Sequence, residues 1–303
     1  MPIGSEARLR IQQTARHLKD RIRVAVELGR ESHGPDVGTQ KVLSELWHTN
    51  APDLRGRPIG DFGFSVHSQT DEDGILLYLF SVVGTTNREA VEICAGDGME
   101  CNTANLLLNH GWYGLLVDGD PNNVAKARRF YARSKRTQTF PPRIVQAWIT
   151  RDAVNQIIRD NDFSGEIDLL SLDLDGVDYW IWKAITAISP RVVVLEYQDI
   201  LGPDRLWTVP YADDFTASKH SMTGVMPNFA GASLRAFTKL AQSKGYRLIG
   251  VNGYGFNAFF MRNDVGAEQF FEVPVADCFT HPKTLEGMAK RFPLVADMPW
   301  VEI

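Results

Sequence analysis

Carboxylates gather directly after two apolar runs in the middle of the chain. Asp173 and Asp175 follow the run at 169–172, and Glu196 follows the run at 192–195. If these runs are neighbouring parallel strands, their carboxyl ends meet at one edge of the sheet. Acids placed there can accept a proton from a hydroxyl or share Mg²⁺ through oxygen ligands. Asp173, Asp175 and Glu196 are therefore candidate catalytic residues, and Asp173 and Asp175 are candidate metal ligands.

A glycine turn and a distant aspartate indicate a second kind of site. Residues 91–98, Val-Glu-Ile-Cys-Ala-Gly-Asp-Gly, predict a short strand that ends in a turn where the backbone can approach a ligand closely. Twenty residues after Gly98 a second strand ends on Asp118. An acid at that place can accept hydrogen bonds from both ribose hydroxyls, so the pair predicts a site for an adenosine-bearing cofactor.

The charges in the turn distinguish between two classes of cofactor. A dinucleotide brings a pyrophosphate, which Asp97 and Glu100 would repel from the start of the following helix. The third small position of the dinucleotide pattern is also occupied by Cys101. S-adenosylmethionine has no phosphate and carries an ammonium and a sulfonium, which acids attract. The turn therefore favours S-adenosylmethionine, although the spacing to Asp118 alone also permits NAD.

Four segments together resemble the FkbM-like branch of the class I S-adenosylmethionine-dependent methyltransferases. They are Ser-Gln-Thr-Asp-Glu-Asp at 68–73, Glu-Ile-Cys-Ala-Gly-Asp-Gly at 92–98, Leu-Leu-Val-Asp-Gly-Asp at 115–120 and Asp-Leu-Leu-Ser-Leu-Asp-Leu-Asp-Gly at 168–176. The resemblance covers roughly residues 65–262 and leaves both ends of the chain uncovered. One departure is Cys94-Ala95, where many relatives have a glycine.

The resemblance implies a Rossmann-like α/β fold with seven strands in the order 3-2-1-4-5-7-6 and the cofactor across the carboxyl ends of the first strands. It implies that the turn cradles the methionine half, that Asp118 binds the ribose, and that residues after the third strand flank the adenine. The implied cofactor-binding residues are Gln69, Glu92, Gly96, Asp97, Gly98, Asn102, Asp118, Trp148 and Ile149. Glu92 also has a simpler interpretation, since it could only cap neighbouring backbone.

Some residues near these motifs have alternative interpretations. His220 is a candidate general base because its unperturbed pKa suits proton removal near neutrality, and His67 could face the cofactor from the upstream loop. Asp175 could instead belong only to a turn, with Asp178 capping the next helix. The aromatic residues at 179–182 are expected to pack in the core.

The elements that must position these residues alternate between helix and strand from residue 71 onward, which predicts a parallel sheet covered on both faces. A hairpin at 246–252 and 257–262 is expected to close one edge. The stretch 198–230 is aromatic-rich and lacks a clear period, so we interpret it as a lid insertion or substrate wall.

Two regions are expected along the chain. Residues 1–60 form an N-terminal helical extension, where an apolar seam within 5–29 suggests a lid or a homodimer contact. Residues 61–303 form the S-adenosylmethionine-binding catalytic domain. Cys94, Cys101 and Cys278 lack the number and spacing of a disulfide framework or zinc site.

Composition narrows the class of partner. The 303 residues are 44% hydrophobic with a net charge of −5, and no apolar run is long enough to span a membrane. The net charge gives no footprint for nucleic acid, and the charged N-terminus lacks a signal-peptide core. We therefore expect a cytoplasmic protein with a small-molecule substrate and with neither a nucleic-acid nor a membrane partner.

These features predict an enzyme, an S-adenosylmethionine-dependent methyltransferase that acts on a small molecule. O-methyl transfer in secondary metabolism or glycan modification is the expected reaction. Two alternatives stay open. One is an NAD-dependent oxidoreductase, and the other is a non-catalytic relative that keeps the methyltransferase fold and binds a partner protein.

Overall fold

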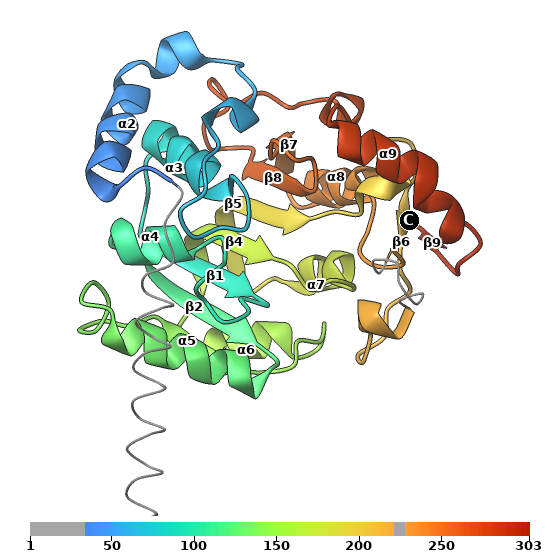
Figure 1. Cartoon of the computed structure of the whole chain (residues 1–303), viewed down its shortest axis with the longest axis horizontal. Helices are drawn as coiled ribbons and strands as arrows, with labels where there is room; N and C mark the ends of the chain where they lie inside the picture. The colour runs from blue at the N-terminus through green and yellow to red at the C-terminus, as the bar shows by residue number, and fades with distance from the viewer. Residues whose placement is uncertain (1–33, 221–227) are drawn as a thin grey trace, which may run out of the picture. The chain divides into compact units, whose positions relative to one another are not determined.

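A computed structural model describes residues 34–220 and 228–303 of the chain (Figure 1). Residues from Gly34 to Ile303 form one compact unit. The helix expected within 5–29 lies outside the described residues. No helix in the described ranges is both long enough and apolar enough to cross a lipid bilayer.

A seven-stranded sheet forms the centre of the compact unit, in the order β3-β2-β1-β4-β5-β8-β7. The strands are β1 (Glu89–Ile93), β2 (Tyr113–Asp118), β3 (Arg143–Gln146), β4 (Gly165–Leu172), β5 (Ile188–Glu196), β7 (Tyr246–Val251) and β8 (Asn257–Arg262). The first five are parallel, whereas β8 is antiparallel to both β5 and β7. The predicted Rossmann-like order is confirmed. The labels differ only because β6 (Trp207–Thr208) pairs with β9 (Val301–Glu302) in a separate small sheet.

Helices cover both faces of the sheet because β4 and β5 are apolar on both sides. One core layer contains buried residues of α3 (Glu72–Val83), α4 (Ala104–Asn109) and α5 (Pro121–Arg133). The other contains those of α6 (Val154–Asp160), α7 (Asp178–Ala184) and α8 (Leu234–Ser243). In the second layer Trp182 is fully buried and packs against Phe237 and Phe260, as expected of the aromatic residues in α7.

Helix α2 (Val37–Thr49) is part of the compact unit, whereas the sequence suggested a boundary near residue 60. The reason is its packing. Trp47 lies edge-on to Phe62 and Tyr78, and the fully buried Gln40 shares a hydrogen bond with His110 at 2.7 Å. Burial lowers the pKa of His110 to about 4, so this contact is made by a neutral imidazole at neutral pH.

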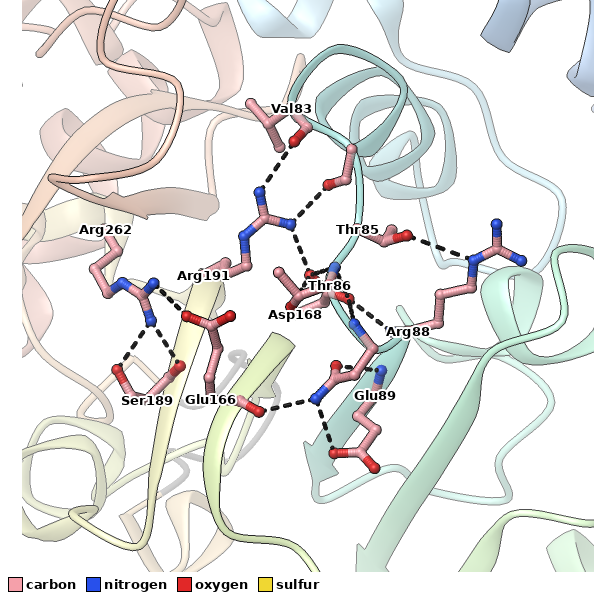
Figure 2. Close-up of polar contacts among 12 residues, drawn as sticks. Val83, Thr85, Thr86, Arg88, Glu89, Glu166, Asp168, Ser189, Arg191 and Arg262 are labelled. Atoms are coloured by element: carbon pink, nitrogen blue, oxygen red, sulfur yellow. Dashed lines mark hydrogen bonds and ion pairs between the residues drawn. The ribbon is translucent and has the colours of Figure 1, made fainter.

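A buried ion pair joins the strands at the amino ends of β4 and β5 (Figure 2). The fully buried Asp168 carboxylate accepts from Arg191 at 2.8 Å and from the backbone N–H groups of Thr86, Asn87 and Arg88. Burial alone would raise the pKa of Asp168, but these donors outweigh it and lower that pKa. The network fixes the loop that precedes β1. The glycine turn follows the opposite end of the same strand.

Candidate functional site

The glycine turn folds over the end of β2. The N–H groups of Cys94 and Ala95 both donate to the Val117 carbonyl, at 2.8 and 3.1 Å. Gly96 has a φ of 57° and Gly98 a φ of 69°, a region that favours glycine. The two glycines differ in their surroundings. A Cβ on Gly96 would meet nothing within 4 Å, whereas one on Gly98 would lie 3.1 Å from Ala127. Gly96 is thus the open position of the turn, and Gly98 is packed against α5.

Asp118 ties this turn to the end of β2. Its carboxylate accepts from the N–H of Gly96 at 2.9 Å and from the N–H of Asp120 at 2.8 Å. The side chain stays half-buried. A carboxylate held this way is fixed in orientation beside the open glycine, which is the place predicted for the ribose.

Glu92 is engaged by protein donors on both oxygens. One oxygen accepts from the Asn102 N–H at 2.9 Å and the Ser171 hydroxyl at 3.1 Å; the other accepts from the N–H and the hydroxyl of Thr103. The amide of Asn102 also donates to Ser171 at 3.1 Å. Four donors fill the acceptor positions of a carboxylate. Glu92 and Asn102 therefore brace the segment after the turn, in line with the simpler interpretation of Glu92.

The segment upstream of α3 reaches the same turn. Asp73 accepts from three successive N–H groups, those of Val66, His67 and Ser68, at 2.7, 2.5 and 2.7 Å. His67 hydrogen-bonds the Met99 backbone, and its pKa is lowered, chiefly by burial. The spacing within 68–73 did not single out Asp73, although an acid early in a helix is a common backbone cap. Gln69 is exposed.

Trp148 lies over the end of β2, on the side predicted for the adenine. Its ring is so close to Gly119 that a Cβ there would lie 3.0 Å from it. Its indole N–H donates to the Asp213 carbonyl at 2.5 Å. Although the side chain is 55% exposed, it is held in place by its contact with Gly119 and by its hydrogen bond to Asp213. Ile149, by contrast, is buried in the core.

The tertiary structure brings three predicted acids together. Asp173 and Asp175 leave β4, Glu196 ends β5, and one carboxylate oxygen of each lies within 4.8 Å of the others. Asp178 turns the other way: it accepts from the N–H groups of Leu174 and Gly176, at 2.6 and 3.0 Å. Asp178 therefore shapes the turn, while the other three form the acid cluster.

The acid cluster holds protons more tightly than isolated acids do. The pKa of Asp173 is raised to about 7, first by the protein atoms around it and then by Asp178 and Asp175. Solvent still reaches this side chain, so it is crowded but not sealed. The pKa of Glu196 is raised as well, by burial and by Asp173, with which it shares a hydrogen bond. One proton is thus held between the two groups near neutral pH.

The glycine turn lies next to the acid cluster, and the thiol of Cys94 is close enough to both to be affected by their charges. Its pKa is raised first by burial and then by the charges of Asp178, Asp118, Asp173 and Asp175. Cys94 itself has a φ of 63°, an uncommon conformation for a residue other than glycine. Acids from the ends of β2 and β4 therefore surround one strained turn.

A strap of residues 207–216 runs beside this site. Phe215 lies against Gly176, where a Cβ would come within 2.5 Å of its ring. Tyr211 accepts from the Arg151 N–H at 2.9 Å and donates to Asp213 at 2.5 Å. The strap thus contacts Trp148 through Asp213 and the acid-cluster turn through Phe215. His220 ends a short helical turn, η4 (Ala217–His220), and its side chain lies outside the described residues.

Comparison with known proteins finds similarity at the level of structure. No protein-family model and no curated protein matches the sequence. A solved S-adenosylmethionine-dependent methyltransferase from Clostridium acetobutylicum is 13% identical and aligns over 59% of this chain and 85% of its own, with a TM-score of 0.35. Magnesium protoporphyrin IX methyltransferase from Synechocystis, solved with bound SAM, is 10% identical over 76% of this chain and 99% of its own, with a TM-score of 0.39.

A third similar structure is mitomycin 7-O-methyltransferase, which is 19% identical over 59% of this chain and 50% of its own, with a TM-score of 0.38. Similarities this distant carry no argument about activity.

Proposed function

We propose that this protein is an S-adenosylmethionine-dependent methyltransferase that acts on a small molecule by O-methyl transfer. The observation that carries the proposal is the negative charge around the glycine turn. Asp118, Asp173, Asp175 and Asp178 all act on the Cys94 thiol. A site with this charge attracts a sulfonium and an ammonium and repels a pyrophosphate.

The residues present fit the ribose and the adenine of the cofactor. Asp118 is fixed beside the open face of Gly96, where it would bind the ribose hydroxyls. Trp148 lies over Gly119 and offers its ring to the adenine. When bound, S-adenosylmethionine would supply an electrophilic methyl group. Glu92 and Asn102 would act indirectly, by holding the segment after the turn.

The acid cluster would act on the acceptor. A hydroxyl must lose its proton as it attacks the methyl group, and an acid with a pKa near 7 is matched to accept that proton at neutral pH. Asp173 has such a pKa. Its partner Glu196 would hold its own proton and donate a hydrogen bond to Asp173, which leaves Asp173 as the carboxylate that accepts the proton of the acceptor. This is the reason to expect an O-methyl product.

The same acids would also suit a divalent cation. Asp173, Asp175 and Glu196 offer only oxygen ligands, which Mg²⁺ and Ca²⁺ prefer, and their oxygens converge within 4.8 Å. Titration calorimetry with MgCl₂ tests this use directly. We expect binding in the wild type and its loss in Asp175→Ala. Activity that survives both exhaustive chelation and Asp175→Ala would exclude a metal.

Calorimetry with S-adenosylmethionine tests the proposed cofactor. We expect the wild type to bind it and Asp118→Ala to bind at least tenfold more weakly. Asp162→Asn is a matched control, because Asp162 is an exposed acid that pairs with Arg143 away from the turn. Absence of binding by the wild type, or equal binding by Asp118→Ala, would contradict the proposal.

The oxidoreductase is the second candidate, and the position of Asp118 is the observation in its favour. Thermal unfolding separates the two. We expect S-adenosylhomocysteine to raise the melting temperature and NAD to leave it unchanged. The reverse pattern would replace the methyltransferase with a dehydrogenase. Cofactor binding without turnover on any acceptor would instead favour the non-catalytic relative.

A further inference from the structure

One stretch of the chain is basic throughout, although the protein as a whole is acidic. Residues 121–151 contain eight of the 32 Lys and Arg residues and none of the 37 Asp and Glu residues, in a chain with a net charge of −5. The stretch includes α5, the loop after it and β3. The net charge of −5 therefore conceals a locally basic segment in an otherwise acidic chain.

The cations of α5 lie on its outer side. Its other side is buried in the core layer beside the sheet, and Figure 1 shows the helix in the outer layer of the molecule. Arg129 and Arg133 are one turn apart and exposed, and Lys135 and Arg136 continue the exposed charge into the loop. Exposed positive charge thus continues from the helix into the loop.

Most of this charge is not neutralised within the described part of the chain. Arg143 pairs with Asp162 at 3.0 Å, and Arg151 pairs with Asp152 at 3.7 Å. No ion pair among the described residues involves the other exposed cations of this region, which we call the basic surface: Arg128, Arg129, Arg133, Lys135 and Arg136. They remain available to an external anion.

A strongly exposed aromatic residue lies in the same loop. Phe140 is 80% exposed and is followed by Pro141 and Pro142. Exposed cations attract anionic headgroups, and an aromatic beside them can insert at the interface. Single-stranded nucleic acid is bound by several stacking aromatics along a groove. Here the other strongly exposed aromatic of the stretch, Trp148, lies beyond the far end of β3, so the arrangement favours a bilayer.

We propose that the basic surface and Phe140 bind an anionic lipid bilayer, with Phe140 inserted between headgroups. The loop leads into the amino end of β3, while the candidate site lies at the carboxyl ends of the strands. The inference is independent of the proposed function. It revises the expectation of no membrane partner, which rested on net charge and on the lack of a spanning segment.

Co-sedimentation of the full chain with vesicles tests the inference. We expect at least tenfold stronger binding to phosphatidylcholine vesicles that contain about 30% phosphatidylserine than to pure phosphatidylcholine, and loss of that difference in 0.5 M NaCl. The triple variant Arg133→Glu, Lys135→Glu and Arg136→Glu should bind at least tenfold more weakly. Phe140→Ala should weaken binding severalfold at both salt concentrations, because insertion is apolar.

A matched triple reversal at exposed cations outside the basic surface, Arg55→Glu, Arg235→Glu and Lys283→Glu, should keep most of the binding. Circular dichroism and thermal unfolding check that each variant is folded. Two results would overturn the inference. One is vesicle binding that neither the basic-surface triple variant nor Phe140→Ala weakens. The other is tighter binding to a labelled homopolymeric RNA that only the charge reversal abolishes.

Discussion

At the scale of single residues, the site depends on charges and conformations that cost stability. Cys94, Gly96 and Asp175 all have positive φ, and the acids around them repel one another. Strain and like charge persist at such places when the surrounding structure holds them, and a ligand can relieve them. Removing one of the repelling charges should therefore raise the free energy of unfolding, whereas replacing a glycine of the turn should lower it.

Replacing Asp173 with Asn is expected to stabilise the unliganded protein at pH 8. The folded-state pKa of Asp173 is about 7, above the ordinary value near 4, so its ionised form is disfavoured by folding. The contribution of Asp173 to stability is therefore greatest below about pH 4 and is lost as pH rises from there through 7. Asn cannot ionise. After allowance for solvent screening, we expect a gain of about 1–2 kcal/mol at pH 8.

Urea unfolding at pH 5 and pH 8 measures this effect. The gain should be smaller at pH 5, and Asp162→Asn, which removes an exposed acid, should show no comparable trend. A loss of stability in Asp173→Asn that is equal at both pH values would contradict the raised pKa.

The two glycines of the turn should respond differently to alanine. Both substitutions force a positive φ, which costs about 1 kcal/mol. Gly98→Ala adds a contact at 3.1 Å with Ala127, so it should cost about 1–3 kcal/mol more. Gly96→Ala should instead weaken S-adenosylmethionine binding more than it lowers stability, because its Cβ enters open space. Equal unfolding free energies for the two variants would refute this distinction.

At the scale of elements, the strap of residues 207–216 joins the two halves of the site. Trp148 contacts it through the Asp213 carbonyl, and the indole of Trp180 in α7 donates to the Val209 carbonyl at 2.8 Å. The strap therefore contacts both Trp148, on the side proposed for the adenine, and α7, on the side of the acid cluster. Hydrogen bonds hold it at only a few points. A change at one point should loosen the strap without unfolding the sheet.

Trp148→Phe should increase hydrogen exchange in residues 207–216 severalfold, because it keeps an aromatic ring but removes the donor to Asp213. The global unfolding free energy should change by less than about 1 kcal/mol, the usual value of one hydrogen bond at a partly exposed site. Trp47→Phe, an aromatic change in α2, is the control. Unchanged exchange in the strap would show that the indole N–H does not hold it.

At the scale of the whole molecule, a buried ion pair holds the amino ends of the strands opposite the candidate site. Arg191 reaches Asp168 and also the carbonyls of Val83 and Gly84, at 3.0 and 2.7 Å. Arg262 links β8 to Glu166 at 2.6 Å on the same side (Figure 2). The contacts of Arg191 and Asp168 join β5 and β4 to the segment between α3 and β1, and Arg262 joins β8 to β4. These contacts should therefore affect global stability.

Asp168→Asn should destabilise the fold by about 3–5 kcal/mol at pH 7, because it leaves the Arg191 charge buried and unpaired. The pKa of Asp168 is lowered in the fold, so the stability that the pair contributes is present above the ordinary pKa near 4 and is lost as pH falls through the lower folded value. The difference between variant and wild type should therefore shrink below pH 4. Urea unfolding from pH 3 to pH 7 measures it, and a constant difference would contradict the mechanism.

The sequence by itself determined the alternation of elements and most strand ends, since apolar runs and turn residues are local signals. The confirmed order of the sheet and the confinement of Asp173, Asp175 and Glu196 to the ends of β4 and β5 follow from those signals. Only the tertiary structure decided which polar side chains face each other. In the folded chain Glu92 accepts hydrogen bonds from four donors, one of them on Ser171, 79 residues away. Asp178 accepts from the backbone of its own turn. Local sequence patterns do not reveal such partners.

The same limit explains the features that the sequence did not reveal. Net charge is a sum, so it concealed the basic surface of α5, which exists because the sheet buries one side of the helix and exposes the other. The strap meets Trp148 across 65 residues of chain, a contact that no spacing rule predicts. Residue types and local periodicity are written in the sequence, whereas long-range partners and the sign of each surface arise only when the elements pack.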